Sequence, residues 1–159
     1  MKEKTEARKP QVKTFAPEIL LEEYRRLLES EDRIEALPLV ITGGSMTPFL
    51  VGGRDTVYLS RLTRPARRGD MLLYRRRNGT YVLHRVYRAE ETLTMVGDAQ
   101  TELEPGICPS QVMAIVTRVE RKGKSLGPGD FRWEFFEKVW LRMIPVRRGI
   151  MKLYAAVRK

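Results

Sequence analysis

The chain of 159 residues has few of the side chains that build disulfides and metal sites. Cys108 is its only cysteine and His84 its only histidine. A single cysteine cannot form a disulfide within the chain, and the two residues together fall short of the four Cys and His ligands of a structural zinc site. We therefore expect no internal disulfide, no metal and no other cofactor.

Long apolar runs are also missing. No segment approaches the roughly 18 consecutive apolar residues that a membrane-spanning helix requires. The first residues, MKEKTEARKPQVKTF, mix both charge signs and lack the apolar core of a secretory signal. The sequence thus predicts a cytoplasmic protein with neither a transmembrane helix nor a signal peptide.

Basic residues, by contrast, are in excess. The net charge is +10, which favours an anionic partner such as nucleic acid, a lipid surface or an acidic peptide. Residues 131–159 carry eight lysines and arginines against two glutamates, together with both tryptophans and three of the five phenylalanines. This tail is predicted either to lie on an anionic membrane surface or to pack on the domain as an amphipathic helix ended by Pro145. No recognition motif for nucleic acid is present, so no specific nucleic-acid partner is expected.

The order of patterns predicts the domain organisation. Residues 1–15 are charged and are expected to be a disordered lead-in. An N-terminal segment over 16–36 contains apolar residues at helical spacing, which predicts a helix from about 17 to 30. Residues 37–122 are expected to form the main domain, residues 123–130 a Gly/Pro linker and residues 131–159 the basic aromatic tail.

The main domain is predicted to be antiparallel β structure. Short apolar and β-branched runs alternate with Gly, Pro, Asn and Asp, and no long helical pattern separates them. An Asn-Gly pair at 78–79 predicts a hairpin. The runs cover residues 37–42, 56–62, 70–77, 80–89, 92–97 and 111–121.

One serine stands in an unusual setting. The stretch ITGGSMTPFL places Ser45 after the first predicted strand, between two glycines and Met-Thr-Pro. A serine hydroxyl becomes a nucleophile only when a base takes its proton, and His84 is the only histidine. Strand alternation puts His84 on one face with Val82 and Val86, where burial would keep the imidazole neutral. Asp98, 14 residues later at the end of the next strand, could orient that imidazole.

Four motifs in order give these residues a family context. GGSMTPFL, RRGDMLLY, YVLHRVY and MVGDAQ, spread over about residues 39–120, resemble the motifs of type I signal peptidases of the Ser-His kind, which occur in the endoplasmic reticulum, in archaea and in sporulating bacteria. The resemblance implies the antiparallel β fold that signal peptidases share with self-cleaving repressors. Those repressors use a lysine as base, so a histidine at position 84 favours the Ser-His branch.

The resemblance also implies roles for single residues. It makes Ser45 the nucleophile, His84 the base and Asp98 a supporting acid. The backbone around the nucleophile, at Gly44, Ser45 and Met46, would hold the oxyanion. A second acid typical of this branch has Glu102 and Glu104 as its candidates.

Simpler interpretations remain open beside this one. Ser45 and Asp98 are also typical turn residues, and His84 could be a buried strand histidine with no chemical role. The arginines at 61–68 and 75–77 could form a solvated face or bind an acidic substrate segment. The function expected is a serine endopeptidase that cleaves a leader or signal segment from a peptide. The alternative is a non-catalytic peptide- or membrane-binding module with the same fold.

Overall fold

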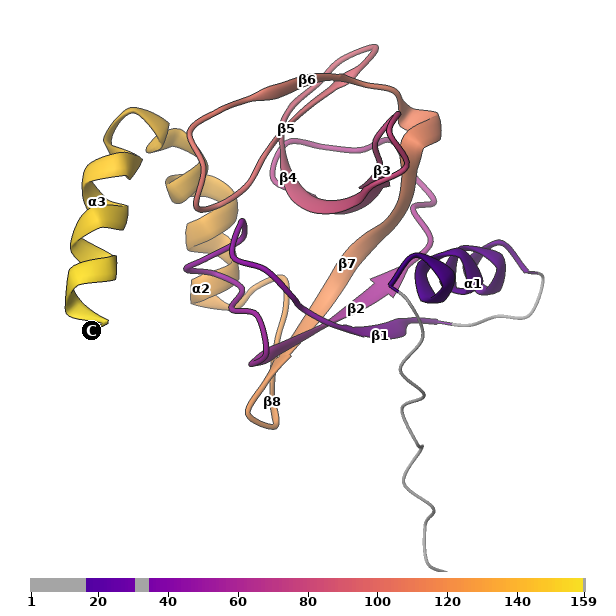
Figure 1. Cartoon of the computed structure of the whole chain (residues 1–159), viewed down its shortest axis with the longest axis horizontal. Helices are drawn as coiled ribbons and strands as arrows, with labels where there is room; N and C mark the ends of the chain where they lie inside the picture. Colours follow the sequence, from indigo (N-terminus) through magenta and orange to yellow (C-terminus); the bar gives the residue numbers. More distant parts are fainter. Residues whose placement is uncertain (1–16, 31–34, 159) are drawn as a thin grey trace, which may run out of the picture.

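The apolar, β-branched segments of the chain form one antiparallel sheet (Figure 1). A computed structural model describes residues 17–30 and 35–158. The strands are β1 (Leu37–Val40), β2 (Asp55–Ser60), β3 (Met71–Arg75), β4 (Tyr81–Ala89), β5 (Leu93–Val96), β6 (Glu104–Ile107), β7 (Val112–Arg121) and β8 (Lys124–Leu126). The sheet runs in the order β1-β2-β7-β3-β4-β5-β6, and β8 pairs with β7.

Helices precede and follow the strands along the chain. α1 (Pro17–Glu29) precedes β1, and a short 3₁₀ turn (Pro109–Gln111) leads into β7. After β8 the chain forms α2 (Phe131–Glu134), a π-helical segment (Phe135–Val139), a 3₁₀ turn (Trp140–Arg142) and α3 (Ile144–Val157). Figure 1 shows α1 and α3 at opposite ends of the molecule, with the strands between them.

The two faces of the sheet bury separate apolar clusters, as period-two alternation requires. One cluster joins Leu28 of α1, Val57, Leu73 and Val116 to Trp133 of α2. The other gathers side chains of β3, β4 and β5 with Ile107, and its strand members are Leu72, Tyr74, Val86, Leu93 and Met95. Adjacent positions of β3 and β4 therefore point to different cores, which decides which side chains can reach His84.

The predicted mainly antiparallel β fold, with a helix at each end, is confirmed. The Asn-Gly hairpin is also confirmed, because β3 and β4 pair directly across Asn78 and Gly79. The helix predicted for the 16–36 segment covers Pro17–Glu29. The lead-in predicted for 1–15 lies outside the described residues.

The predicted linker over 123–130 is wrong in one respect. Residues Lys124–Leu126 form β8, which pairs with Val119–Arg121 across a tight turn at Lys122 and Gly123. Lys122 and Gly123 both have positive φ, which suits this turn. The glycines were therefore turn signals rather than signs of a free linker.

The basic aromatic tail divides into two parts. Residues 131–142 pack on the domain with Trp133, Trp140 and Leu141 buried, as one of the two predictions for this segment had it. Pro145 lies in the first turn of α3 and so begins a second helix instead of ending the first. None of the helices in the described ranges has the length and apolar character needed to cross a membrane.

Candidate active site

Ser45 lies in the turn between β1 and β2. Gly43, two residues before it, has φ +77°, a left-handed conformation that glycine adopts without steric cost. After it, Met46, Phe49 and Leu50 are buried, and the Leu50 amide donates to the Met46 carbonyl at 2.8 Å. The apolar side of the turn is thus packed into the core, which leaves the half-buried Ser45 at its polar end.

A buried carboxylate holds the base of this turn. Asp55 is fully buried and accepts from the Val51 amide at 3.0 Å and from the side chains of Arg54 and Arg121. Arg121 also donates to the carbonyl of Phe49. Although burial opposes ionisation, these donors together hold the pKa of Asp55 well below its ordinary value. The motif GGRD, which contains Asp55, therefore anchors the serine turn.

The segment that follows β5 packs against the same turn. The Ala99 amide donates to the Ser45 carbonyl at 2.9 Å. A side chain at Gly97 could not be accommodated, because its Cβ would lie 2.5 Å from that carbonyl oxygen. The close approach of these two segments therefore requires glycine at position 97.

His84 lies on β4 opposite Leu72 and is 3% exposed. Burial lowers the pKa of its imidazole to about 4, although the nearby carboxylate of Glu104 opposes that effect. The ring is therefore neutral at pH 7, which is the state that a general base needs.

Tyr74 and Glu104 complete the surroundings of this ring. The Tyr74 hydroxyl donates to Glu104 Oε2 at 2.8 Å and lies 3.3 Å from His84 Nδ1. Because the Tyr74 proton is directed at the carboxylate, the Tyr74 oxygen is left to accept a proton from Nδ1. This assigns the His84 proton to Nδ1 and leaves Nε2 with a free lone pair.

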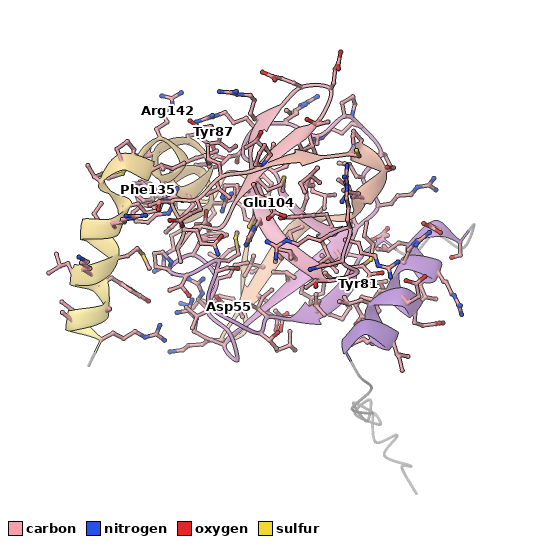
Figure 2. All side chains as sticks on the ribbon, turned by 45° about the horizontal axis from the view of Figure 1, so that its top comes forward. Asp55, Tyr81, Tyr87, Glu104, Phe135 and Arg142 are labelled. Atoms are coloured by element: carbon pink, nitrogen blue, oxygen red, sulfur yellow. The ribbon has the colours of Figure 1, made fainter. Side chains whose placement is uncertain are left out.

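Glu104 is fixed in turn by Arg76. The guanidinium donates to both carboxylate oxygens, at 2.7 and 2.6 Å, and this pairing lowers the pKa of Glu104. In Figure 2, Glu104 lies among the side chains over the middle of the sheet. Arg76, Glu104, Tyr74 and His84 thus form one chain of hydrogen bonds that ends at the imidazole.

Ser45 and His84 line the same cavity, of about 270 Å³, although they are 39 positions apart in the sequence. Within the described part of the chain, no hydrogen bond joins the two side chains. The backbone N-H groups of Ser45 and Met46 also have no hydrogen-bond partner among residues 17–30 and 35–158, whereas the Gly44 carbonyl accepts from Thr47. The other walls are formed by Arg76, Gln100 and apolar side chains: Ile41, Met46, Val82 and Leu83.

Asp98 has a partner other than His84. Its carboxylate accepts from Arg85 Nε at 3.0 Å and Nη2 at 2.9 Å, and both side chains are buried. The Asp98 carbonyl accepts from the Trp140 indole at 2.8 Å. The structure thus gives Asp98 the contacts of a buried structural residue, and it is Glu104, through Tyr74, that is linked to the imidazole.

Arg147 of α3 joins the C-terminal segment to the end of β5. It is fully buried and donates to the carbonyls of Gly97, Gln100 and Trp140, at 3.0, 2.7 and 2.8 Å. Since the Ala99 amide between them binds Ser45, α3 indirectly supports the serine turn.

Sequence reasoning missed Tyr74, Asp55 and Arg147. Tyr74 could have been found, because the Asn-Gly hairpin sets the β3–β4 register and places Tyr74 and His84 on one face, two positions apart. Nothing in the sequence pairs Arg147 with loop carbonyls 47 or more positions away.

No protein-family model, no curated protein and no solved structure matches this chain.

Proposed function

We propose that this protein is a serine endopeptidase in which Ser45 is the nucleophile and His84 the general base. The observation that supports it most is the cavity shared by a serine on a tight turn and a buried, neutral imidazole. Within that class, the motif order favours the Ser-His type I signal peptidases. The proposed reaction is therefore cleavage of a leader or signal segment from a peptide.

In the proposed mechanism, His84 Nε2 takes the proton of Ser45 Oγ as that oxygen attacks the peptide carbonyl carbon. The free N-H groups of Ser45 and Met46 stabilise the oxyanion of the tetrahedral intermediate. The imidazolium then passes its proton to the leaving amine as the C-N bond breaks, which leaves an acyl group on Ser45. Water, deprotonated by His84, then attacks the ester carbon; the C–Oγ bond breaks, Ser45 Oγ takes the proton back from His84, and the acid is released.

Tyr74 and Glu104 support this base from the Nδ1 side of the ring. The Tyr74 oxygen holds the Nδ1 proton, so that Nε2 stays free to accept from serine. Burial lowers the pKa of His84, and the negative charge of Glu104 partly offsets this effect, so that it favours the imidazolium that forms during attack. In this proposal Glu104 takes the supporting role that the sequence assigned to Asp98.

The resemblance to Ser-His signal peptidases implies small residues such as alanine on the acyl side of the cut. The apolar wall of the cavity comes from Ile41, Met46, Val82 and Leu83. Its total volume of about 270 Å³, which must also admit the peptide backbone, is consistent with such residues.

The test is cleavage of a diverse peptide mixture, read by mass spectrometry, with the native protein, S45A and H84A. We expect defined cuts by the native protein that disappear in both variants. S125A is the matched control, since Ser125 lies on exposed β8 away from the cavity, and it should cut like the native protein. Cuts that persist in S45A would overturn the assignment. Peptide binding without any cut by the native protein would favour the binding module.

We also propose that the outer side of α3 contacts an anionic membrane surface. Val146, Leu153 and Val157 are 54%, 67% and 80% exposed and lie at helical spacing on one stripe. Lys152 and Arg158 are exposed on the two flanks of this stripe, about a third of a turn away on either side, which suits a helix at an anionic lipid interface. In Figure 2, Arg142 likewise points outward from the C-terminal helices.

A further inference from the structure

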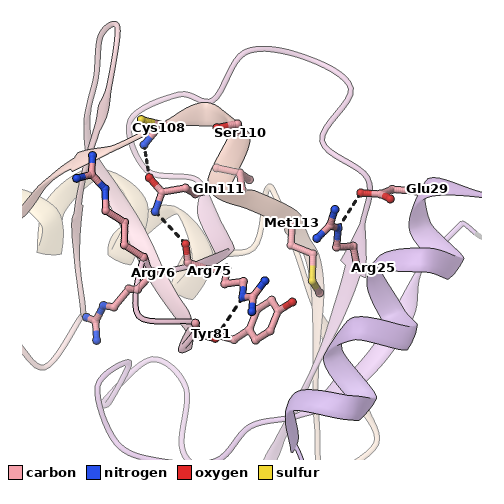
Figure 3. A pocket seen from close by; sticks show the side chains of 12 residues that line it. Arg25, Glu29, Arg75, Arg76, Tyr81, Cys108, Ser110, Gln111 and Met113 are labelled. Carbon is pink, nitrogen blue, oxygen red and sulfur yellow. Dashed lines mark hydrogen bonds and ion pairs between the residues drawn. The ribbon is translucent and has the colours of Figure 1, made fainter.

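A second cavity, of about 510 Å³, lies beside the proposed cleft (Figure 3). Figure 3 shows Arg25 and Glu29 of α1 on one side, and Arg75, Arg76 and the turn before β7 on the other. Four arginines line this cavity, Arg25, Arg75, Arg76 and Arg77, against a single carboxylate, Glu29. Since Glu29 is bound by Arg25 at 3.1 Å, the cavity carries an excess of positive charge.

The arginines of the hairpin differ in how their charge is used. Arg76 pairs with both carboxylate oxygens of Glu104 through Nε and Nη2. Arg75 contacts only the Gly79 carbonyl, at 3.4 Å, and the ring of Tyr81. Within residues 17–30 and 35–158, neither Arg75 nor Arg77 has a carboxylate partner. Both are exposed at the cavity and retain N-H donors for an anion.

The backbone that carries Arg75 is held in place. The Gln111 side chain donates to the Arg75 carbonyl at 2.9 Å and accepts from the Cys108 amide at 2.9 Å. These two bonds tie the hairpin to the turn before β7. An anion that binds Arg75 therefore meets a side chain whose backbone is already fixed. This reduces the conformational entropy lost on binding.

This cavity is continuous in its walls with the proposed cleft. Arg76 and Tyr81 line both this cavity and the one that contains Ser45 and His84. An extended peptide held at Ser45 could thus pass along Tyr81 to Arg75 and Arg77.

We infer that this cavity binds acidic side chains of the substrate, so that the enzyme selects peptides with Asp or Glu near the cleaved bond. This inference rests on the proposed function, because it takes the cleft at Ser45 as the site of cleavage. Carboxylates suit the planar donor groups of Arg75 and Arg77, and an acidic peptide complements the charge of the cavity.

The test uses a binding measurement that does not depend on cleavage. Fluorescence anisotropy measures how tightly the S45A protein binds each of two labelled peptides. The peptides are taken from a native cut site, or from an Ala-rich sequence if no cut is found. One peptide carries three Glu next to the small residues and the other three Gln. We expect the Glu peptide to bind roughly tenfold more tightly, and to lose about fivefold in affinity in R75Q/R77Q, as expected for two exposed ion pairs.

The matched control removes the same charge elsewhere. Arg61 and Arg118 are exposed and line neither cavity, so R61Q/R118Q should leave the preference for Glu unchanged. Equal binding of the two peptides, or an equal loss in the control variant, would overturn the inference. So would a single-stranded oligonucleotide that competes more strongly than the acidic peptide with the same dependence on Arg75 and Arg77.

The two proposals fail separately. Cleavage by the native protein with no difference between Glu and Gln peptides would remove the acidic specificity and leave the peptidase. Arginine-dependent binding of the Glu peptide without cleavage would remove the peptidase and leave an acidic-peptide site.

Discussion

At the scale of single residues, the two carboxylates near the cleft have different surroundings and hence different roles. Asp98 is enclosed with Arg85 and contributes to the fold. Glu104 is half-buried and reaches the imidazole through one hydroxyl. Since only the second arrangement fixes the tautomer of His84, the acid that supports the base is Glu104 in our proposal.

Replacing Tyr74 by phenylalanine tests this chain of hydrogen bonds. The substitution keeps the ring in the core and removes the acceptor of the His84 Nδ1 proton, so the proton can move to Nε2, where it blocks base catalysis. We expect kcat for peptide cleavage to fall about 100-fold, with KM within about twofold of native. Steady-state kinetics on a single cleaved peptide measures both.

The comparison variant is D98N. Breaking the buried pair leaves the Arg85 charge without its partner, which is expected to lower the free energy of unfolding by about 3 kcal/mol. In the folded fraction, kcat should stay near native. A D98N protein of native stability with a 100-fold lower kcat would instead restore Asp98 as the supporting acid.

The sequence allowed candidate site residues to be selected where a reactive side chain also stands in a rare local context. Ser45 and His84 could be selected because each has a rare feature, a glycine-flanked turn for one and its uniqueness for the other. The supporting role expected for Asp98 stays a prediction, and its buried pairing with Arg85 could not be read from the sequence. Alternation along β4 indicates only that Arg85 and His84 lie on opposite faces of the strand.

At the scale of elements, local patterning predicted the strands that have apolar residues and missed those that do not. β6 has the sequence EPGI and β8 the sequence KSL, and neither shows a β-branched run. They exist because β5 and β7 offer them edges to pair with, which is a tertiary effect. β6 is also the strand that places Glu104 against Tyr74.

The C-terminal helix provides the element-scale prediction. Cosedimentation with vesicles of anionic phospholipid should detect binding, and L153S/V157S should weaken it roughly tenfold because apolar area is lost from the lipid-facing stripe. Vesicles of zwitterionic lipid should bind less, and added salt should weaken the anionic interaction.

Two exposed apolar residues outside α3 provide the control. Ile19 on α1 and Val40 on β1 are 61% and 60% exposed, so I19S/V40S removes similar apolar surface without touching the tail. Equal binding by both double variants would show that the α3 stripe does not carry the interaction. Retention of the native protein in the supernatant with anionic vesicles would have the same meaning.

At the scale of the whole molecule, buried charged side chains surround the candidate site. Asp55 with two arginines, Asp98 with Arg85, and the fully buried Arg147 surround the serine turn and the end of β5. Such groups are costly to bury, and each of them has hydrogen-bond partners here, although Nε of Arg147 has none among the described residues. The fold therefore depends on the ionisation state of its interior, and its stability should depend on pH.

His84 sets this dependence between about pH 4 and 6.5. Its pKa is about 4 in the folded protein against an ordinary value of 6.5, so in that range the unfolded chain binds a proton that the folded protein does not. The contribution of His84 to the free energy of unfolding is fully present above its unfolded pKa of 6.5. It is lost as the pH falls toward the folded pKa of about 4. The pKa values of Asp55 and Glu104 are lowered on folding, so their contributions are lost at lower pH, as the pH falls below the unfolded values of carboxyl groups.

We therefore expect the free energy of unfolding to decrease by about 3 kcal/mol between pH 6.5 and pH 4 because of His84 alone. Urea denaturation at half-unit pH steps measures this slope. H84N removes the titrating group at nearly the same size, and its stability should vary much less across the same range. If native and H84N proteins lose stability in parallel, the imidazole titrates as it does in the unfolded chain. It would then not be the buried neutral base on which the proposed mechanism depends.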